Sequence, residues 1–213
     1  MWSFKDHGKS YDKINERVTQ PGFRWVHDSF GSNYRMTEMQ AAIGRIQLVK
    51  LAAWSERRRS ISEKIYRGLV LYSHEKGPIR LPRMRCGRNG PDCNSFMTDS
   101  ELLSCKSGCQ SAYYKLYIYV KPNRISKEWS RDRIIAEINQ RGIPCFSGTC
   151  GEVYLEKAFD NTGFRPLHSL PVAKELAETA IMFLVHPTLS DYQVDKMINE
   201  IQNVLNIAGS GIN

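Results

Sequence analysis

The apolar residues that follow Thr37 recur at the spacing of an α-helix. The segment Thr37-Glu38-Met39-Gln40 is typical of a capping box, in which the threonine hydroxyl and the glutamine side chain bond to each other's backbone amides. No proline interrupts the pattern before Pro78. The sequence therefore predicts a helix of about 35 residues, or two helices in line, that would join two lobes. Its apolar stripe consists of Ile43, Ile46, Val49, Ile61, Ile65 and Leu69.

Strands and helices alternate in the last hundred residues. Tyr113–Val120 is dense in aromatic and β-branched residues, which predicts a strand. A helix would begin at Ser130 and end at Gly142, and Pro171 suits the first position of another helix. The order is β-α-β-loop-α-β-α, which predicts a small α/β lobe. The later expected elements are a strand at 143–146, a helix at 171–179, a strand at 180–185 and a final helix opened by a second capping box at 190–193.

Residues 78–112 are rich in Gly, Pro, Ser and Cys, which favours an insertion with little regular structure. Six, eleven and three residues separate its successive cysteines, and these spacings match no recognised zinc pattern. Reduced free thiols are the preferred interpretation, and a zinc site is the alternative. The four cysteines are Cys86, Cys93, Cys105 and Cys109.

Composition narrows the classes of function. The chain has 213 residues, 41% of them apolar, so it can bury a substantial core. A net charge of +8 attracts phosphates, but no interleaving of aromatic and basic residues points to nucleic acid as a partner. No stretch reaches the roughly 20 apolar residues of a membrane helix, and the first residues lack a signal peptide. A cytoplasmic location without a membrane partner is expected.

Four segments of the chain resemble one family of enzymes. They are "SFKDHGKSYDK", "GSNYRMTEMQAAIGRIQLVKL", "RGIPCFSGTCGEVY" and "FLVHPTLSD". Together they resemble the DegT/DnrJ/EryC1/StrS family of pyridoxal-phosphate-dependent sugar aminotransferases, which aminate keto-sugars attached to nucleotides. The resemblance implies the C-terminal small lobe and long linking helix of a fold-type-I pyridoxal-phosphate transferase. The expected parts are a large-domain remnant with an active-site loop (1–36), a linking and dimer helix (37–77), the insertion (78–112) and an α/β small domain (113–213).

The resemblance also implies that the large cofactor-binding domain is largely absent. In the family, the aromatic residue that stacks on the cofactor, the aspartate at its ring nitrogen and the Schiff-base lysine precede the matching segments. Lys5 follows Ser3-Phe4 as the family lysine does, but no Gly-Glu-Gly-Gly hairpin comes after it. Asp6-His7-Gly8 resembles the segment behind that lysine instead. A C-terminal portion that is inactive alone is expected, with no catalytic residue and no metal ligand assigned.

The family's Asn-Tyr-Arg segment reaches into the active site of the neighbouring subunit. By resemblance, Asn33 would donate to the phosphate of pyridoxal 5'-phosphate, while a turn residue before the helix is the alternative. Arg35 would offer its fork to the substrate's phosphates or anchor the loop. Tyr34 is a further substrate-binding candidate, although packing is the preferred interpretation.

Two further positions match the family near its substrate. His186 falls at a strand end beside the substrate channel, and a hydrogen-bonded core histidine is the preferred alternative. The segment with Cys150, Glu152 and Tyr154 stands where many relatives carry a His-Tyr-x-x-x-His motif against the substrate diphosphate. A carboxylate there would repel a diphosphate, which argues against a sugar-nucleotide substrate.

These observations leave several functions open. The first is the C-terminal part of an aminotransferase that acts on a nucleotide-linked keto-sugar in surface polysaccharide or amino-sugar synthesis. The second is a non-catalytic interaction protein from the same family. The expected partner in both cases is a second copy or a complete aminotransferase. A zinc or nucleic-acid module would rest only on the charge and on residues 78–112.

Overall fold

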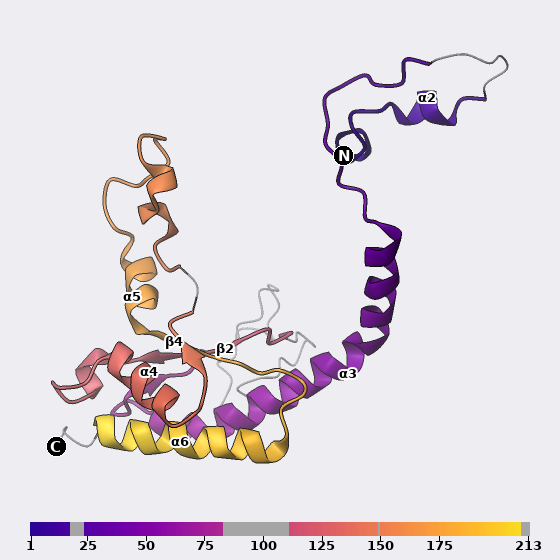
Figure 1. Ribbon diagram of the computed structural model, residues 1–213. Helices are drawn as coiled ribbons and strands as arrows, with labels where there is room; N and C mark the ends of the chain where they lie inside the picture. The colour runs from indigo at the N-terminus through magenta and orange to yellow at the C-terminus, as the bar shows by residue number, and fades with distance from the viewer. Residues whose placement is uncertain (18–23, 83–110, 149, 210–213) are drawn as a thin grey trace, which may run out of the picture. The chain divides into compact units, whose positions relative to one another are not determined.

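The computed structural model describes residues 1–17, 24–82, 111–148 and 150–209. The chain divides into two compact units, Met1–Ala52 and Ala53–Asn213. Cys86, Cys93, Cys105 and Cys109 lie outside the described residues, so the free-thiol and zinc interpretations stay predictions. Figure 1 labels the main helices and strands.

The first unit is held together by pairing between its first residues and the segment before the long helix. It contains the short helices α1 (Trp2–Lys5) and α2 (Tyr11–Asn15). The backbone amides of Ser32 and Tyr34 donate to the carbonyls of Phe4 and Lys5, and Asp6 and Asn33 form an antiparallel bridge. The loop before the long helix therefore lies against residues 4–9.

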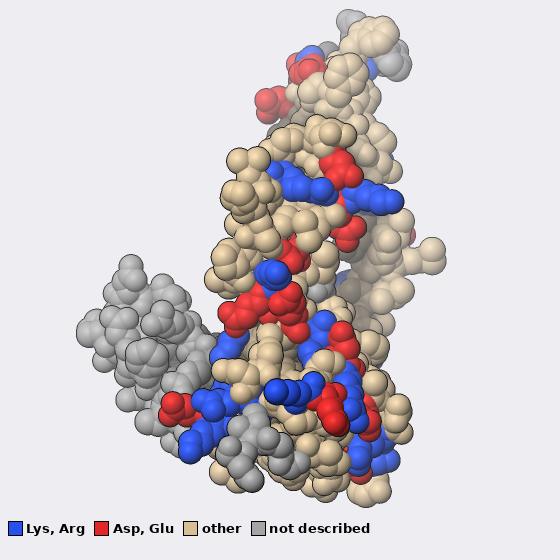
Figure 2. Space-filling model, turned by 90° about the vertical axis from the view of Figure 1, so that its left-hand side faces the viewer, with Lys and Arg blue, Asp and Glu red and all other residues tan. Residues whose placement is uncertain are grey.

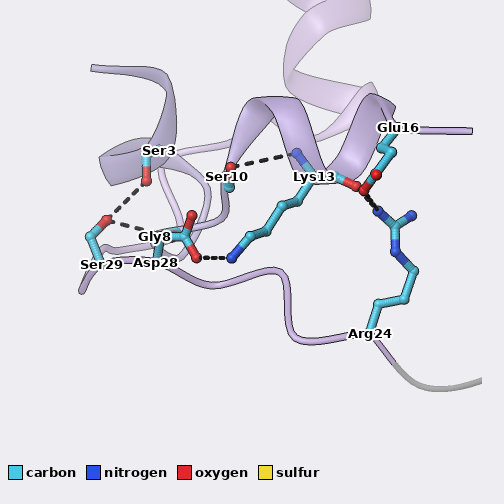
Figure 3. Close-up of polar contacts among 8 residues, drawn as sticks. All are labelled: Ser3, Gly8, Ser10, Lys13, Glu16, Arg24, Asp28 and Ser29. Atoms are coloured by element: carbon cyan, nitrogen blue, oxygen red, sulfur yellow. Dashed lines mark hydrogen bonds and ion pairs between the residues drawn. The ribbon is translucent and has the colours of Figure 1, made fainter.

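Side-chain contacts fasten the returning segment to α2 (Figure 3). The Lys13 ammonium donates to Asp28 Oδ1 at 2.5 Å, and the Arg24 guanidinium pairs with Glu16 at 3.1 Å beyond the end of α2. At the other end of the segment, the hydroxyls of Ser3 and Ser29 lie 3.0 Å apart.

Helix α3 (Glu38–Leu69) confirms the predicted long helix and its capping box. The Thr37 amide donates to Gln40 Oε1 at 3.0 Å, and the Gln40 amide donates to Thr37 Oγ1 at 3.3 Å. Only the second half of the predicted apolar stripe is buried. Ile65 is fully buried, whereas Ile46 is 57% exposed. The 3₁₀ turn η1 (Val70–Tyr72) follows the helix.

A four-stranded antiparallel sheet in the order β1-β2-β4-β3 forms the centre of the second unit. Alternate residues of β2 are buried, as expected for a strand with one face on the core. The buried part of α3 packs with α4 and α6 against this face. The strands are β1 (Ile79–Arg80), β2 (Leu116–Val120), β3 (Cys145–Phe146) and β4 (Ala180–Phe183). The helices are α4 (Arg131–Gln140), α5 (Pro171–Thr179) and α6 (Asp191–Gly209).

The structure confirms the mixed helix-and-sheet class and corrects the bounds of several strands. Strand β3 begins at Cys145 instead of 143, and β4 ends at Phe183 instead of 185. Strand β1 falls at the start of the predicted insertion, where a two-residue strand leaves almost no periodic signal. Strand β2 begins at Leu116 instead of Tyr113, because Tyr113 has a φ of 42°, which is incompatible with a strand. The remaining 3₁₀ turns are η4 (Pro122–Arg124), η5 (Val153–Leu155) and η6 (Lys157–Phe159).

Candidate functional site

The side chain of Asn33 is fixed by Arg35, two residues further along the chain. Asn33 Oδ1 accepts from the Arg35 backbone amide at 3.3 Å and from Arg35 Nε at 3.2 Å. The two residues therefore form one small polar unit on the loop that precedes α3. Because both Arg35 groups are donors, the carboxamide must turn its oxygen toward them.

The carboxylate of Asp6 lies next to the pair formed by Asn33 and Arg35. Its Oδ1 atom is 3.5 Å from Arg35 Nε and 3.5 Å from Lys9 Nζ. Asp6 is only 8% exposed, and within the described chain its Oδ1 accepts no hydrogen bond. A buried carboxylate needs compensating charge, which these two cations supply. The Arg35 guanidinium also donates to His7 Nε2 at 3.5 Å.

Tyr34 and Lys5, also in the first unit, lie beside aromatic rings. Tyr34 is 67% exposed, and its ring centroid is 5.9 Å from that of Phe4. The ammonium group of Lys5 lies 5.4 Å from the centre of the Trp2 ring. His7 has a φ of 59°, so it occupies a left-handed turn next to Gly8.

His186 belongs to the second unit, whereas Asn33 and Arg35 belong to the first. Its side chain is exposed, and its Nδ1 atom is 2.7 Å from Thr188 Oγ1. The interpretation as a core histidine is therefore wrong. The fully buried strand β4 ends at Phe183, and His186 lies beyond it with an exposed side chain.

Glu152 and Tyr154 form a hydrogen-bonded network in the long loop before α5. The Tyr154 hydroxyl donates to Glu152 Oε1 at 2.6 Å, and it accepts from the Leu170 amide at 2.8 Å. The Ser169 hydroxyl donates to the same Glu152 oxygen. These hydrogen bonds, first from Ser169 and then from Tyr154, hold the pKa of Glu152 below its usual value.

Arg165 also stabilises this loop. Its Nε donates to the Tyr154 carbonyl at 2.8 Å, its Nη2 to the Glu156 carbonyl at 3.0 Å, and it pairs with Asp160 at 2.6 Å. Sequence reasoning did not single out Asp6, Arg165 or Ser169. No local pattern marks them, because Asp6 contacts the distant Arg35 and Ser169 contacts the distant Glu152. Arg165 acts mainly on backbone carbonyls, which leave no mark in the sequence.

A groove of about 450 Å³ lies between β1, the end of β2 and α5, and cations line it. Each of these cations has a partner. Arg80 pairs with Glu175 at 3.3 Å, Lys174 with Glu178 at 3.9 Å, and Lys121 donates to the His74 carbonyl at 2.7 Å. The groove therefore offers no concentrated positive charge.

Charges on the visible face of the molecule are mixed. Figure 2 shows Lys and Arg side chains next to Asp and Glu without a broad basic area. Lys64 pairs with Asp195 at 2.6 Å and Arg57 with Asp191 at 2.9 Å.

Over the described ranges, no group of three or more His, Cys, Asp or Glu could hold a metal ion. None of the helices described is long and apolar enough to cross a membrane.

Comparison with known proteins gives a consistent set of matches. The model of the DegT/DnrJ/EryC1/StrS aminotransferase family matches residues 2–83. The structure of an aminotransferase from Psychrobacter cryohalolentis is 47% identical with a TM-score of 0.81, over 95% of this chain and 47% of that chain. The dTDP-3-amino-3,4,6-trideoxy-alpha-D-glucose transaminase of Streptomyces venezuelae is 24% identical over 179 residues, which are 84% of this chain and 38% of the relative.

A more distant structure shows the fold alone. Spr1654 of Streptococcus pneumoniae in its PLP-form is 20% identical with a TM-score of 0.67, over 96% of this chain and 42% of that chain. The chain thus aligns along 84% to 96% of its own length with less than half the length of each of these proteins.

Proposed function

Because the chain belongs to the DegT/DnrJ/EryC1/StrS aminotransferase family, we propose that it forms the C-terminal portion of a pyridoxal-phosphate-dependent aminotransferase. The substrate would be a keto-sugar linked to a nucleotide, in the synthesis of amino sugars for surface polysaccharides. The observation that carries this proposal is the fixed Asn33 carboxamide on the loop before α3.

The geometry at Asn33 fits a phosphate ligand. Its oxygen is occupied by two donors from Arg35, so the group that can serve a ligand is the Nδ2 amide. An amide N–H is the complement of a phosphate oxygen, and a hydrogen bond to a charged acceptor is stronger than a neutral one. When bound, pyridoxal phosphate supplies the electron sink for amino-group transfer. The proposed role of Asn33 is to hold its phosphate, and that of Arg35 is to orient Asn33.

The partner would be a second copy of the chain or a complete aminotransferase, with Asn33 reaching the partner's cofactor. The first half of α3 supports such a partner, because it carries an exposed apolar stripe. Contiguous apolar surface of this kind is typical of an interface. The stripe consists of Met39, Ile43, Ile46 and Val49, which are 78%, 60%, 57% and 84% exposed.

The network around Glu152 gives its carboxylate a structural role. Its Oε1 atom accepts from the hydroxyls of Tyr154 and Ser169, so the carboxylate is bound within the loop. Such a carboxylate stabilises the loop, which accounts for its presence in place of the family's histidines.

A cofactor titration of Asn33 variants tests the proposal. The chain is co-purified with a complete aminotransferase of the family, and pyridoxal phosphate affinity is measured by absorbance. Asn33→Ala should remove one charge-assisted hydrogen bond worth about 1.5–3 kcal/mol, which corresponds to a roughly ten- to hundredfold loss of affinity. Asn33→Asp keeps the oxygen that Arg35 needs but places a negative charge at the phosphate, so the loss should be at least as large.

The two variants separate a phosphate donor from a turn residue. A turn residue tolerates Asn33→Asp, because Asp takes the same turn geometry. Unchanged affinity in Asn33→Asp, with an intact complex, would therefore contradict the proposed role. Failure of the chain to form any complex would contradict the proposed partner.

A further inference from the structure

The oxygen and the nitrogen of the Asn33 carboxamide have different surroundings. Two Arg35 donors hold its oxygen, while among the described residues no acceptor bonds to its Nδ2. A free carboxamide on a loop exchanges its two ends readily, but here an exchange would set Nδ2 against two donors. The orientation of the group therefore depends on where Arg35 is held.

Arg35 is held in turn by Asp6. The guanidinium Nε lies between Asn33 Oδ1 at 3.2 Å and Asp6 Oδ1 at 3.5 Å. The Asp6 carboxylate is buried, and the antiparallel bridge between Asp6 and Asn33 places the two backbones side by side. The buried carboxylate of Asp6 therefore holds the guanidinium of Arg35 in place.

We propose that Asp6 and Arg35 are positioning residues that keep the Nδ2 amide of Asn33 directed at a phosphate. The inference rests on the proposed function, which already gives Arg35 the role of orienting Asn33, and it adds Asp6, which acts on Asn33 through Arg35. An ion pair with one half-exposed partner contributes modestly, so loss of the Asp6 charge should weaken phosphate binding only about three- to tenfold.

Lys9 provides a matched control. It pairs with Asp6 Oδ1 at the same 3.5 Å as Arg35 but makes no contact with Asn33. Lys9→Met should therefore leave Asn33 and phosphate binding unchanged, whereas Asp6→Asn and Arg35→Lys should affect both. Arg35→Lys retains the positive charge beside Asp6 and removes the Nε donor. It therefore tests whether Arg35 orients Asn33 even if Asp6→Asn disturbs the structure of residues 4–9.

The first measurement uses the chain alone and needs no cofactor. Nitrogen-15 relaxation of side-chain amides reports the order of the Asn33 NH₂ group, which is assigned by its disappearance in Asn33→Asp. The order should be high in the wild type and in Lys9→Met, and it should fall in Asp6→Asn and Arg35→Lys. Equal order in all four proteins would overturn the inference, whatever the cofactor does.

The second measurement is a double-mutant cycle for pyridoxal phosphate affinity in the complex with a complete aminotransferase. If Asp6 acts through Asn33, Asp6→Asn should weaken binding in the wild type and have no further effect in Asn33→Ala. Additive losses would overturn the inference and assign Asp6 a general structural role. No loss in Asn33→Ala itself would instead contradict the proposed function, while the relaxation data still decide whether Asp6 orders Asn33.

Discussion

The hydroxyl of Tyr154 donates to Oε1 of Glu152 at 2.6 Å and closes the loop before α5. Tyr154 is only 9% exposed, although it lies in a loop that carries exposed apolar side chains such as Phe164 and Leu167. The buried phenol and the carboxylate thus stabilise a segment that has little core of its own. The negative charge of Glu152 is part of that arrangement.

The stability of the chain should therefore depend on pH through Glu152. Its pKa lies below its ordinary value of 4.5 in the folded chain, because the hydroxyls of Ser169 and Tyr154 bond to the charged form. A lowered folded-state pKa stabilises the fold above the ordinary value, and this contribution is lost as the pH falls through the folded-state pKa. Glu152→Gln should reduce the urea midpoint near pH 6 and have a smaller effect near about pH 3.

Comparison of Glu152→Gln with the wild type separates the contribution of Glu152 to stability from that of other carboxylates. Arg57 lowers the pKa of Asp191, and Arg141 that of Glu200, so both also lose stabilising charge in acid. These groups are the same in both proteins and cancel in the difference. A difference between wild type and Glu152→Gln that does not change with pH would contradict the prediction.

Local signals in the sequence predicted much of the fold. Both capping boxes formed, and the second shows the Ser190 amide donating to Gln193 Oε1 at 2.9 Å. Pro171 begins α5, and Gly142 follows α4 with a φ of 78°. Each of these features depends on residues within one helical turn, so the local sequence is sufficient to specify it.

Pairings between distant residues were not predictable in this way. Asp6 meets Arg35 because residues 4–9 pair with the segment before α3, and nothing in either stretch specifies that register. The contact between Glu152 and Ser169 likewise depends on the path of the intervening loop. Asn33 was identified by resemblance, whereas the residues that orient it became visible only in the folded chain.

Two glycines should respond oppositely to alanine. Gly8 has a φ of +84°, and a Cβ there would lie 1.6 Å from the Ser29 carbonyl oxygen. Gly8→Ala should therefore displace the segment around Ser29, because the backbone itself blocks the added atom. Gly44 lies within α3 with nothing within 4 Å of an added Cβ, so Gly44→Ala should stabilise the helix by about 1 kcal/mol. Limited proteolysis and thermal unfolding check both effects, and protection of the segment in Gly8→Ala equal to the wild type would contradict the first.

The two described cysteines should differ in reactivity. Cys145 is 1% exposed, and burial raises the pKa of its thiol to about 12. Cys150 is free and exposed. Because the thiolate is the reactive form, iodoacetamide should modify Cys150 quickly in native buffer and leave Cys145 unmodified. Peptide mapping by mass spectrometry distinguishes the two sites. In urea both should react, and native labelling of Cys145 at the rate of Cys150 would show that strand β3 is not packed as described.

Helix α3 offers a direct comparison between burial within the chain and exposure for a partner. Ile46 and Ile65 belong to one predicted apolar stripe, but Ile65 is fully buried and Ile46 is 57% exposed. Ile65→Ala should reduce the free energy of unfolding by about 2–5 kcal/mol, because it leaves a cavity in the core. Ile46→Ala should change it far less in the monomeric chain.

Ile46 should matter instead for association. An exposed row of apolar side chains next to Ile46 favours pairing of the chain with itself or with a complete aminotransferase, since pairing removes that surface from water. Ile46→Glu places a charge in the centre of the row, and burying an unpaired charge opposes association strongly. Sedimentation velocity should show the wild type as a dimer or larger species and Ile46→Glu as a monomer of unchanged helicity. Arg45→Gln on the same turn changes the net charge by the same amount and is the control for charge alone. A wild type that stays monomeric at all concentrations, and that does not associate with a complete aminotransferase, would mean that this face of α3 is not an interface.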